Sequence, residues 1–443
     1  MSNSNSLGAG CIGYGGAIAQ SGGLISIFSM LLCAILSKAS FDMIIALSLE
    51  IKAENSSYEE LASHACGFYG MLAVLISKGF FSFGCLVAYI IIVRDNFSPA
   101  SRHLFGLDKP ERCDAAGLWC WLVLNDDFAA FILSATIMLP LSLLRDMTPL
   151  ASFSALKIFT LVLIVLTLCF LYVETEIPEG GSKHVETNVG HWLSVRPGFI
   201  QNMGTFVFTF VAQHTVHLVY QSLWPGVQNI KHWKIVSSLS IAMSSCLALP
   251  IGLFAYLKYW EETTSDLFSL YPPQPAVDIA RLLLCLTMLL TYPMPLFSFR
   301  ELIIVSLPKH NVKSERAHSN QDDKMRAHES DHLLMKLESK KYHQKNHWLL
   351  RGDDHQLHRQ YHFVLTVAIW AITLTLALSA PSLGEVLNLV GCLSGSLIAF
   401  ILPGVISYQM HGYTFVGSTL FTVGVLVGCV GTFFSLVDLM RDL

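Results

Sequence analysis

Residues 7–16 read Leu-Gly-Ala-Gly-Cys-Ile-Gly-Tyr-Gly-Gly, and five of the last nine positions are glycine. They belong to an opening stretch of 37 residues without a charged side chain. Each glycine costs about 1 kcal/mol inside a regular helix, so this density predicts an apolar helix that unwinds here. In mid-bilayer, an unwound backbone lines a cavity or is buried in protein, and its N–H and C=O groups can bind a carboxylate and a cation. The alternative is close helix packing through small residues.

The whole chain is too apolar for a water-soluble globule. Of its 443 residues, 53% are hydrophobic and 14% are charged, against about 45–50% and about 25% in an ordinary soluble domain. Uncharged runs recur along the chain, and each is near the roughly 20 residues that a helix needs to cross a bilayer. The sequence therefore predicts an all-α, polytopic membrane protein with one transmembrane domain over residues 1–443. The net charge of −4 argues against a nucleic-acid partner.

The apolar runs predict eleven spans. Gln20 to Gly23 divides the opening run into a first span and a second that reaches about Ser48. The other nine fall at about 66–93, 127–144, 149–173, 197–221, 235–257, 279–305, 361–380, 386–409 and 413–436. No Ser/His/Asp set and no Walker loop is found, so we expect neither an enzyme nor a resident cofactor or metal.

Basic residues orient the predicted spans. The loop 307–360 carries eleven Lys or Arg, and Lys231 and Lys234 precede the seventh span. Cytoplasmic loops are enriched in such residues, so we expect the N-terminus inside and the C-terminus outside. The same loop is hydrophilic and rich in histidine, and it is predicted to be disordered. It is interpreted as a solvated linker, with partner docking and metal binding as alternatives.

Polar side chains interrupt the sixth span. The sequence Gln213-His214-Thr215-Val216-His217 lies inside the uncharged run 197–221. Such groups are costly in a membrane helix unless they bond to other helices or line a polar pathway, and metal ligation is a third reading. Breaks in the first and sixth spans are five helices apart, the spacing of an inverted repeat of five plus five helices.

A few other polar residues lie within spans. Thr287 and Thr291 are four apart in the eighth span, where hydroxyl oxygens can coordinate Na⁺, although bonding to their own backbone is the alternative reading. Lys38 and Asp42 are also four apart and are expected to pair. Three basic residues near span ends are expected to reach the membrane surface by snorkelling, namely Lys78, Lys157 and Arg281.

Several segments resemble the amino acid/auxin permease family, in particular the sodium-coupled neutral amino acid transporters and their vacuolar relatives. They are Asn-Ser-Leu-Gly-Ala-Gly (5–10), Ser-Tyr-Glu-Glu-Leu-Ala (57–62), Val-Ala-Tyr-Ile-Ile-Ile-Val-Arg-Asp (87–95), Leu-Pro-Leu-Ser-Leu-Leu-Arg-Asp (139–146), Leu-Val-Tyr-Gln-Ser-Leu (218–223) and Leu-Thr-Tyr-Pro (290–293). The resemblance implies a LeuT-like fold that works by alternating access.

The resemblance also implies roles for residues. The amino acid's carboxylate would bind at Gly8, Ala9 and Gly10, and Thr291 matches the family's cation-coordinating threonine. The family's asparagine in the first span falls at Ser4, with Asn3 and Asn5 on either side. Family members carry a tail and most of a half-helix before this point, so we expect either a truncated sequence or a missing half-helix.

The leading hypothesis is secondary active transport of amino acids, with neutral amino acids as the expected substrates and Na⁺ or H⁺ as the coupling ion. The alternatives are an amino-acid sensor without net flux and a divalent-metal transporter. The expected membrane is the plasma membrane or a vacuolar or lysosomal one. The predicted substrate-binding residues are Leu7, Gly8, Ala9, Gly10, Gln213, His214 and His217, and the predicted ion-coupling residues are Ser4, Asn5, Thr287 and Thr291.

Overall fold

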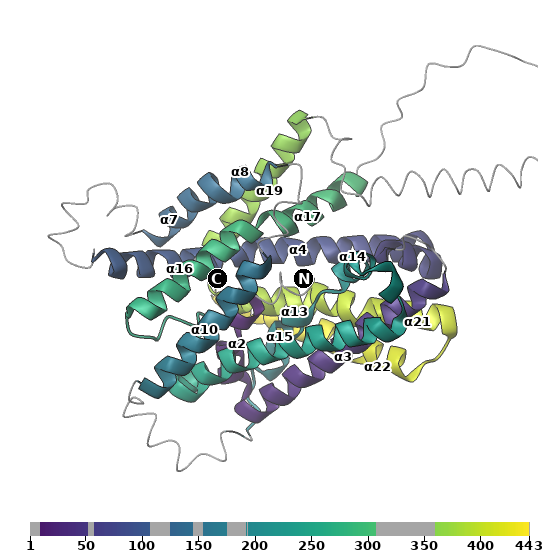
Figure 1. Cartoon of the computed structure of the whole chain (residues 1–443), viewed down its shortest axis with the longest axis horizontal. Helices are drawn as coiled ribbons and strands as arrows, with labels where there is room; N and C mark the ends of the chain where they lie inside the picture. Colours follow the sequence, from purple (N-terminus) through teal and green to yellow (C-terminus); the bar gives the residue numbers. More distant parts are fainter. Residues whose placement is uncertain are drawn as a thin grey trace, which may run out of the picture.

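The computed structural model describes residues 9–51, 57–106, 125–144, 154–174, 192, 194–306 and 359–442. All regular elements in these ranges are helices, so the predicted all-α class is confirmed. Figure 1 shows them as elongated helices that lie alongside one another in a bundle. Ser4, Asn5, Leu7 and Gly8 lie outside the described residues, and so does the predicted loop up to residue 358.

Eight helices or helix runs in the described ranges are long and apolar enough to cross a membrane. They are α3 (Gly23–Glu50), α4 (Tyr58–Phe105), α10 (Ser154–Glu174), α15 (Ile230–Tyr259) with η4 (Trp260–Glu262), α16 (Pro275–Thr291) with α17 (Pro293–Ser306), α19 (Arg359–Ser379), α20 (Leu383–Val390) with η6 (Gly391–Gly395), η7 (Leu397–Ile401) and α21 (Leu402–His411), and α22 (Phe415–Val425) with η8 (Leu426–Gly431) and α23 (Thr432–Asp442). The chain is a multi-pass integral membrane protein.

The three other predicted spans correspond to shorter or interrupted helices. They are α2 (Tyr14–Ser21), the run of α7 (Asp126–Leu133), η1 (Ser134–Met138) and α8 (Leu139–Ser142), and the series α13 (Phe199–Phe210), η2 (Gln213–Thr215) and α14 (Val216–Ser222), which η3 (Pro225–Val227) follows. The count of eleven spans and the inverted repeat remain predictions.

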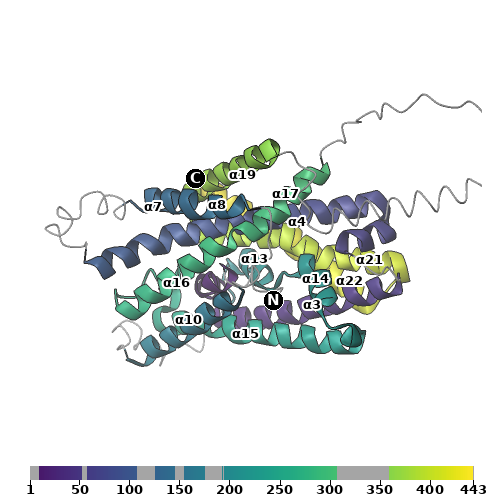
Figure 2. The same cartoon turned by 45° about the horizontal axis from the view of Figure 1, so that its top comes forward.

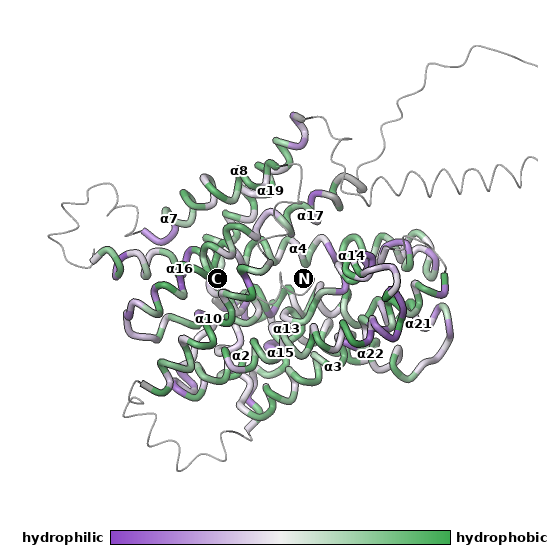
Figure 3. The backbone as a smooth tube through the Cα atoms, in the orientation of Figure 1, coloured by the Kyte–Doolittle hydropathy of each residue, from purple (hydrophilic) through white to green (hydrophobic). Residues whose placement is uncertain are grey.

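Hydrophobic residues predominate along most of the described helices, as the hydropathy colours of the backbone in Figure 3 show. Phe28, Ile35 and Leu239 are each more than 60% exposed, although they belong to membrane-spanning helices. Exposed apolar side chains face hydrocarbon in a bilayer, where they cost nothing. The surface of the described helices is therefore that of a protein solvated by lipid.

Helix α4 is the central element of the bundle and packs against α16, α17, α19, α20 and α21 (Figure 2). The element runs from Tyr58 to Phe105, but a kink at Gly67 (φ 65°, ψ −156°) divides it into two helices. The predicted span of 66–93 therefore begins at this kink and ends too early. The Ser57 hydroxyl accepts a hydrogen bond from the Glu60 N–H at 3.1 Å and so caps its start, and Gly106 ends it in the left-handed conformation at φ 62°. The caps lie beyond the apolar run, which is why hydropathy alone missed them.

The described part of the first span is helical except at Gly13. Residues 9–12 are helical, Gly13 forms a turn (φ −74°, ψ −6°), and α2 follows. In the described residues the predicted unwinding is therefore limited to this single turn, and the rest of the stretch from Ala9 to Gly16 is helical. A Cβ on Gly10 would lie 2.2 Å from Thr209 Oγ1, and one on Gly16 would lie 2.6 Å from the Ser265 backbone nitrogen. These glycines allow close packing, the alternative reading of the sequence.

The predicted break in the sixth span is confirmed. Helix α13 ends at Phe210, and Val211 is extended with ψ 112°. The Ala212 N–H donates to the Gln213 side-chain oxygen at 3.0 Å, so a side chain replaces the lost helical bond. A single 3₁₀ turn then leads into α14.

Helix α13, the first half of the sixth span, contacts α20 and η6 through bare backbone. A Cβ on Gly391 would lie 1.9 Å from the Gly204 carbonyl oxygen, and one on Gly204 would lie 2.1 Å from the Asn388 carbonyl oxygen. Helix α13 thus packs on α20 and η6, and no side chain separates the two helix backbones at this point.

Charged residues within the spans are more deeply placed than predicted. Lys38 and Asp42 pair at 2.6 Å, as expected. The prediction that three other basic residues reach the membrane surface by snorkelling is wrong. Lys78 pairs with Glu59 at 3.1 Å, and Arg281 donates a hydrogen bond to the Phe268 carbonyl oxygen. Lys157 is only 3% exposed. Neighbouring helices cover these groups, which the sequence of one span does not reveal.

Candidate functional site

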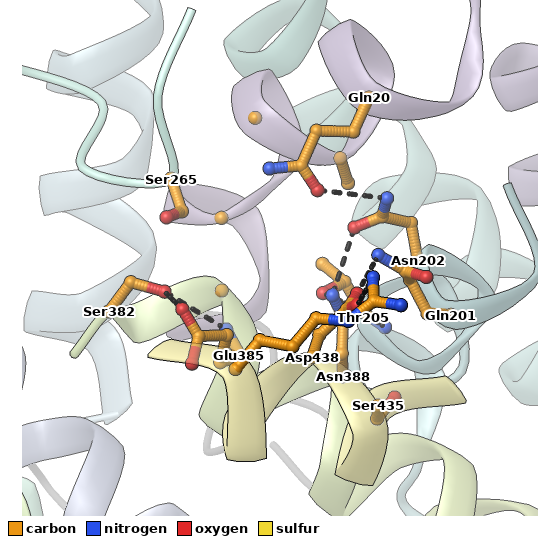
Figure 4. A pocket seen from close by; sticks show the side chains of 15 residues that line it. Gln20, Gln201, Asn202, Thr205, Ser265, Ser382, Glu385, Asn388, Ser435 and Asp438 are labelled. Atoms are coloured by element: carbon orange, nitrogen blue, oxygen red, sulfur yellow. Dashed lines mark hydrogen bonds and ion pairs between the residues drawn. The ribbon is translucent and has the colours of Figure 1, made fainter. Parts of the chain in front are cut away.

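A polar cavity of about 300 Å³ opens between the end of the first span and the helices α13, α20 and α23 (Figure 4). Side chains of residues far apart in the sequence converge on it. Its lining consists of Gly13, Gly16, Ala17, Gln20, Gln201, Asn202, Thr205, Ser265, Ser382, Gly384, Glu385, Asn388, Ser435, Asp438 and Arg441. A hollow lined mainly by amide, hydroxyl and charged groups suits a polar solute better than a lipid tail.

A chain of hydrogen bonds crosses one wall of this cavity. Asn202 donates to the Gln20 side-chain oxygen at 3.1 Å, and Asn388 donates to the Asn202 side-chain oxygen at 2.9 Å. The Asn388 oxygen accepts from the Thr205 N–H at 3.1 Å and from the Thr205 hydroxyl at 2.6 Å. Figure 4 shows these side chains meeting beside the hollow. The network ties α2, α13 and α20 into one wall.

The wall continues toward the break in the sixth span. The Thr209 hydroxyl donates to the Thr205 carbonyl oxygen at 3.0 Å, one turn further along α13. Thr209 is also the residue on which Gly10 packs. The cavity and the break therefore lie along the same stretch of α13. The contact of Gly10 with Thr209, which joins the first and sixth spans, separates the cavity from the break.

The predicted polar residues of the sixth span contact other helices. Gln213 Nε2 donates to Ser40 Oγ at 3.5 Å, and the His217 Nε2 atom lies 2.7 Å from Ser48 Oγ. The His214 ring packs on the Phe81 ring at 5.6 Å between centroids. Interhelical hydrogen bonding, one of the readings of the sequence, is therefore observed for Gln213 and His217. His214 makes a ring contact instead, and its buried Nδ1 atom has no hydrogen-bond partner among the described residues.

The predicted ion-coupling threonines are both buried and bonded to their own helix. The Thr291 hydroxyl donates to the Thr287 carbonyl oxygen at 2.6 Å, and the Thr287 hydroxyl donates to the Leu283 carbonyl oxygen at 2.6 Å. Thr287 Oγ1 also lies 3.1 Å from Thr160 Oγ1 of α10. A hydroxyl that donates its proton keeps its oxygen lone pairs, so these bonds are compatible with cation coordination.

The structure brings the predicted residues together in two groups rather than one. Gly10 and the break in the sixth span form the first, beside α3 and α4, and the two threonines form the second, beside α10. The polar wall around Asn202 and Asn388 was missed. Its signal was an asparagine inside an otherwise apolar run in two spans, 197–221 and 386–409.

Metal ligands do not gather in the part of the chain that the structure describes, where no three His, Cys, Asp or Glu side chains form a group. The sequence His-Glu-Ser-Asp-His at residues 328–332 matches the zinc-binding pattern HExxH, which the interpretation of the histidine-rich loop overlooked. It lies outside the described residues.

Asp266 follows the cavity residue Ser265 in the loop before α16. Burial, followed by the charge of Asp95, raises the pKa of its carboxyl from 3.8 to about 6, although Arg281 acts in the opposite direction. The folded chain thus holds this proton more tightly than the unfolded chain. Stability from this group is present below about pH 4 and is lost as the pH rises to about 6.

The variant Asp266→Asn is therefore expected to be more stable than the parent at pH 7.5, by about 1–3 kcal/mol, and equally stable at pH 4. Melting temperatures of the purified protein at both pH values would measure this. Glu262→Gln, which changes an exposed carboxyl in the same loop region, is the control. An equal difference in melting temperature between the parent and Asp266→Asn at both pH values would contradict the raised pKa of Asp266.

An interrupted helix inside a bundle of membrane-spanning helices, with a polar cavity along the same helix, is typical of membrane transport proteins. The chain belongs to the family described as transmembrane amino acid transporter protein, whose model matches residues 3–440. The resemblance seen in the sequence is thereby confirmed. Members of this family are transporters and not enzymes.

Relatives of this chain carry names of amino acid transporters. It is 26% identical over 298 residues to a candidate sodium-coupled neutral amino acid transporter 11 of Rattus norvegicus, covering 67% of this chain and 61% of the relative. It is 24% identical to vacuolar amino acid transporter 2 of Saccharomyces cerevisiae, covering 90% and 72%. It is 23% identical to sodium-coupled neutral amino acid transporter 7 of Xenopus laevis, covering 90% and 77%. The chain thus spans about three fifths of the rat relative's length.

Proposed function

We propose that this chain moves neutral amino acids across a membrane by alternating access, driven by a gradient of Na⁺ or H⁺. The observation that carries the proposal is the break at Val211–Thr215, next to the tight contact between Gly10 and Thr209. The names of the relatives support the substrate class. The membrane is the plasma membrane or a vacuolar or lysosomal one, and the N-terminus is cytoplasmic.

In this proposal the two ends of the amino acid bind to different spans. Helix α13 ends at Phe210, and backbone carbonyl groups of the interrupted segment that follows it accept hydrogen bonds from the amino group. Backbone N–H groups at Leu7 to Gly10 receive the carboxylate, as in the family the chain resembles. Gln213, His214 and His217 hold the geometry of the break through their contacts with α3 and α4.

The deciding experiment is uptake of labelled alanine, glutamine and leucine into proteoliposomes that contain the purified chain. Inward gradients of Na⁺ and of H⁺ are applied separately, and empty liposomes are the control. Accumulation above the external concentration under either gradient is expected. Binding of the amino acids without accumulation would contradict transport and favour a sensor, and Zn²⁺ uptake that amino acids do not affect would favour a metal carrier.

The coupling cation is proposed to bind beside Thr291, with Thr287, Ser4 and Asn5 as the other candidate positions. Thr291→Ala removes the hydroxyl oxygen of a residue that is 1% exposed. We expect the concentration of the driving cation at half-maximal uptake to rise about tenfold, the equivalent of about 1.4 kcal/mol. Thr291→Ser keeps the oxygen and is the matched control. Unchanged cation dependence in Thr291→Ala would remove this residue from the site.

A further inference from the structure

The short helix that opens α4 folds back on the rest of this element. The kink at Gly67 separates residues 58–66 from the long helix that follows. Lys78 Nζ donates to Glu59 Oε1 at 3.1 Å across this kink, although a straight helix would hold two positions 19 residues apart at a separation of about 28 Å. This folded-back segment, residues 58–66, is named the strap.

One face of the strap is buried in the bundle. Tyr58 is 2% exposed, and Leu61 and Ala62 are 0% exposed. His64, by contrast, is exposed. The Tyr58 hydroxyl donates to the Ile398 carbonyl oxygen at 3.0 Å, within the π-helical segment η7. The strap is therefore wedged into the bundle at the bent end of α4, which lies close to α14 and α21 in both views (Figures 1 and 2).

The strap also contacts the second half of the broken sixth span. The Tyr58 ring stacks on the His217 ring, with 6.4 Å between the centroids and 21° between the planes. His217 belongs to α14, and its Nε2 atom lies 2.7 Å from Ser48 Oγ of α3. Helix α14 has only seven residues, too few for a helix to be stable by itself, so its neighbours fix its position. Tyr58 is one of these neighbours.

Gly67 provides the strap with a hinge, and the ion pair provides it with a latch. The dihedral angles of Gly67, φ 65° and ψ −156°, are accessible to glycine and strained for other residues. A Cβ at this position would meet no atom within 4 Å, so the backbone conformation and not the packing requires glycine. The side chains of Lys78 and Glu59 are 17% and 14% exposed, and removal of one partner from so covered a pair is costly.

We propose that Tyr58 is a positioning residue for α14, and that the strap swings about Gly67 when the pair of Glu59 and Lys78 opens. With the pair closed, Tyr58 holds α14 against α3, and the path from the break to the membrane face near the strap stays shut. With the pair open, α14 loses this support, and the amino acid can pass between the break and that face. This inference rests on the proposed transport function and adds the element that gates one side of its site.

The test measures the exposure of a thiol in the strap. Leu61→Cys places this thiol where the parent side chain is 0% exposed. The full chain in proteoliposomes is treated with N-ethylmaleimide, and mass spectrometry follows the modification of residue 61, with fragmentation to distinguish it from the nearby Cys66. We expect slow modification without amino acid, and modification at least fivefold faster with alanine, glutamine and leucine on both sides of the membrane. A strap that serves only as a static anchor would give the same rate in both conditions.

The latch and the hinge are tested in the Leu61→Cys background without amino acid. Glu59→Gln should speed modification at least fivefold, and the reversed pair, Glu59→Lys with Lys78→Glu, should restore the slow rate. Gly67→Ala should also speed modification. Gly412→Ala is its matched control and should keep the slow rate, because Gly412 has a similar conformation (φ 74°, ψ −150°) and as much open space, in the turn between α21 and α22. Melting temperatures show whether each variant is folded.

The role of the Tyr58 ring is tested by exchange of labelled amino acid against preloaded amino acid. Tyr58→Ala removes the ring that stacks on His217 and should raise the amino acid concentration at half-maximal exchange at least fivefold. Tyr58→Phe keeps the ring and removes only the hydroxyl bond to Ile398, so its half-maximal concentration should stay within twofold of the parent. Equal effects of the two variants would overturn positioning through the ring.

The outcomes separate this inference from the proposed function. If the Leu61→Cys chain exchanges amino acids without any change in the rate of modification, the strap does not move during transport. Slow modification in Glu59→Gln would overturn the latch, and equal rates in Gly67→Ala and Gly412→Ala would overturn the hinge. A parent that neither accumulates nor exchanges amino acids would overturn the proposed function, whereas fast modification in Glu59→Gln without amino acid would still support the latch.

Discussion

Gly10→Ala is expected to lower amino acid uptake by about ten- to a hundredfold. The added Cβ would lie 2.2 Å from Thr209 Oγ1 and 2.9 Å from the Thr209 backbone Cα, so the first and sixth spans must separate. Overpacking of this kind costs about 1–3 kcal/mol. Because Thr209 lies two residues before the break, the displacement reaches the proposed substrate site directly. Initial rates of uptake in proteoliposomes would measure the effect.

Two comparisons show whether the contact itself is responsible. Gly226→Ala adds the same atom where no neighbour lies closer than 3.6 Å, and it should leave uptake unchanged. The double variant Gly10→Ala with Thr209→Ala removes the nearest atom and should recover part of the uptake. If Gly10→Ala transports like the parent, the close approach of the two spans has no part in transport.

Asn388→Ala is the second substitution with a large expected effect. It removes the acceptor of the Thr205 N–H and hydroxyl and the donor to Asn202, in a region where Asn388 is 6% exposed. Leaving buried polar groups without partners costs about 1–3 kcal/mol for each group. We expect the melting temperature to fall by several degrees and uptake to fall about tenfold or more, because the wall of the cavity loses its central bond.

A double-mutant cycle isolates the contribution of this bond. Thr205→Val alone removes the hydroxyl, and its effect combined with Asn388→Ala should be smaller than the sum of the two single effects. Asn229 caps the start of α15, away from the cavity, and Asn229→Ala is the control for the loss of an asparagine side chain. Strictly additive losses would mean that Asn388 and Thr205 do not act on each other.

Much of the architecture follows from composition and from where polar residues interrupt apolar runs. The Gln213–His217 segment predicted the break in the sixth span, because hydrogen-bonding groups in mid-membrane require special surroundings. The glycines of the first span predicted more unwinding than the single turn that is observed at Gly13. A glycine that loosens a helix and a glycine that admits a neighbour look alike in a sequence, and only the presence of Thr209 and Ser265 against them distinguishes the two.

The candidate site was less accessible to prediction because its contacts join distant segments. Asn388 bonds to Thr205 across 183 positions of the chain, and this depends on the register of two helices that no local pattern defines. Lys157 was misread for a similar reason. A lysine near the end of a span ordinarily reaches water, and its burial here is caused by the helices around it.

The bare backbone contact between Gly204 and Gly391 restricts how this molecule can rearrange. Two main chains that touch without intervening side chains leave few flexible atoms to accommodate sliding, so we expect α13 and the helix run of α20 and η6 to move as one rigid unit. Because the hydrogen bond between Asn202 and Gln20 ties α2 to α13, we expect the hollow to be widened or narrowed by the segment around Ser265 and by α23. Probes attached to α13 and α20 should keep a constant separation while those on α23 move.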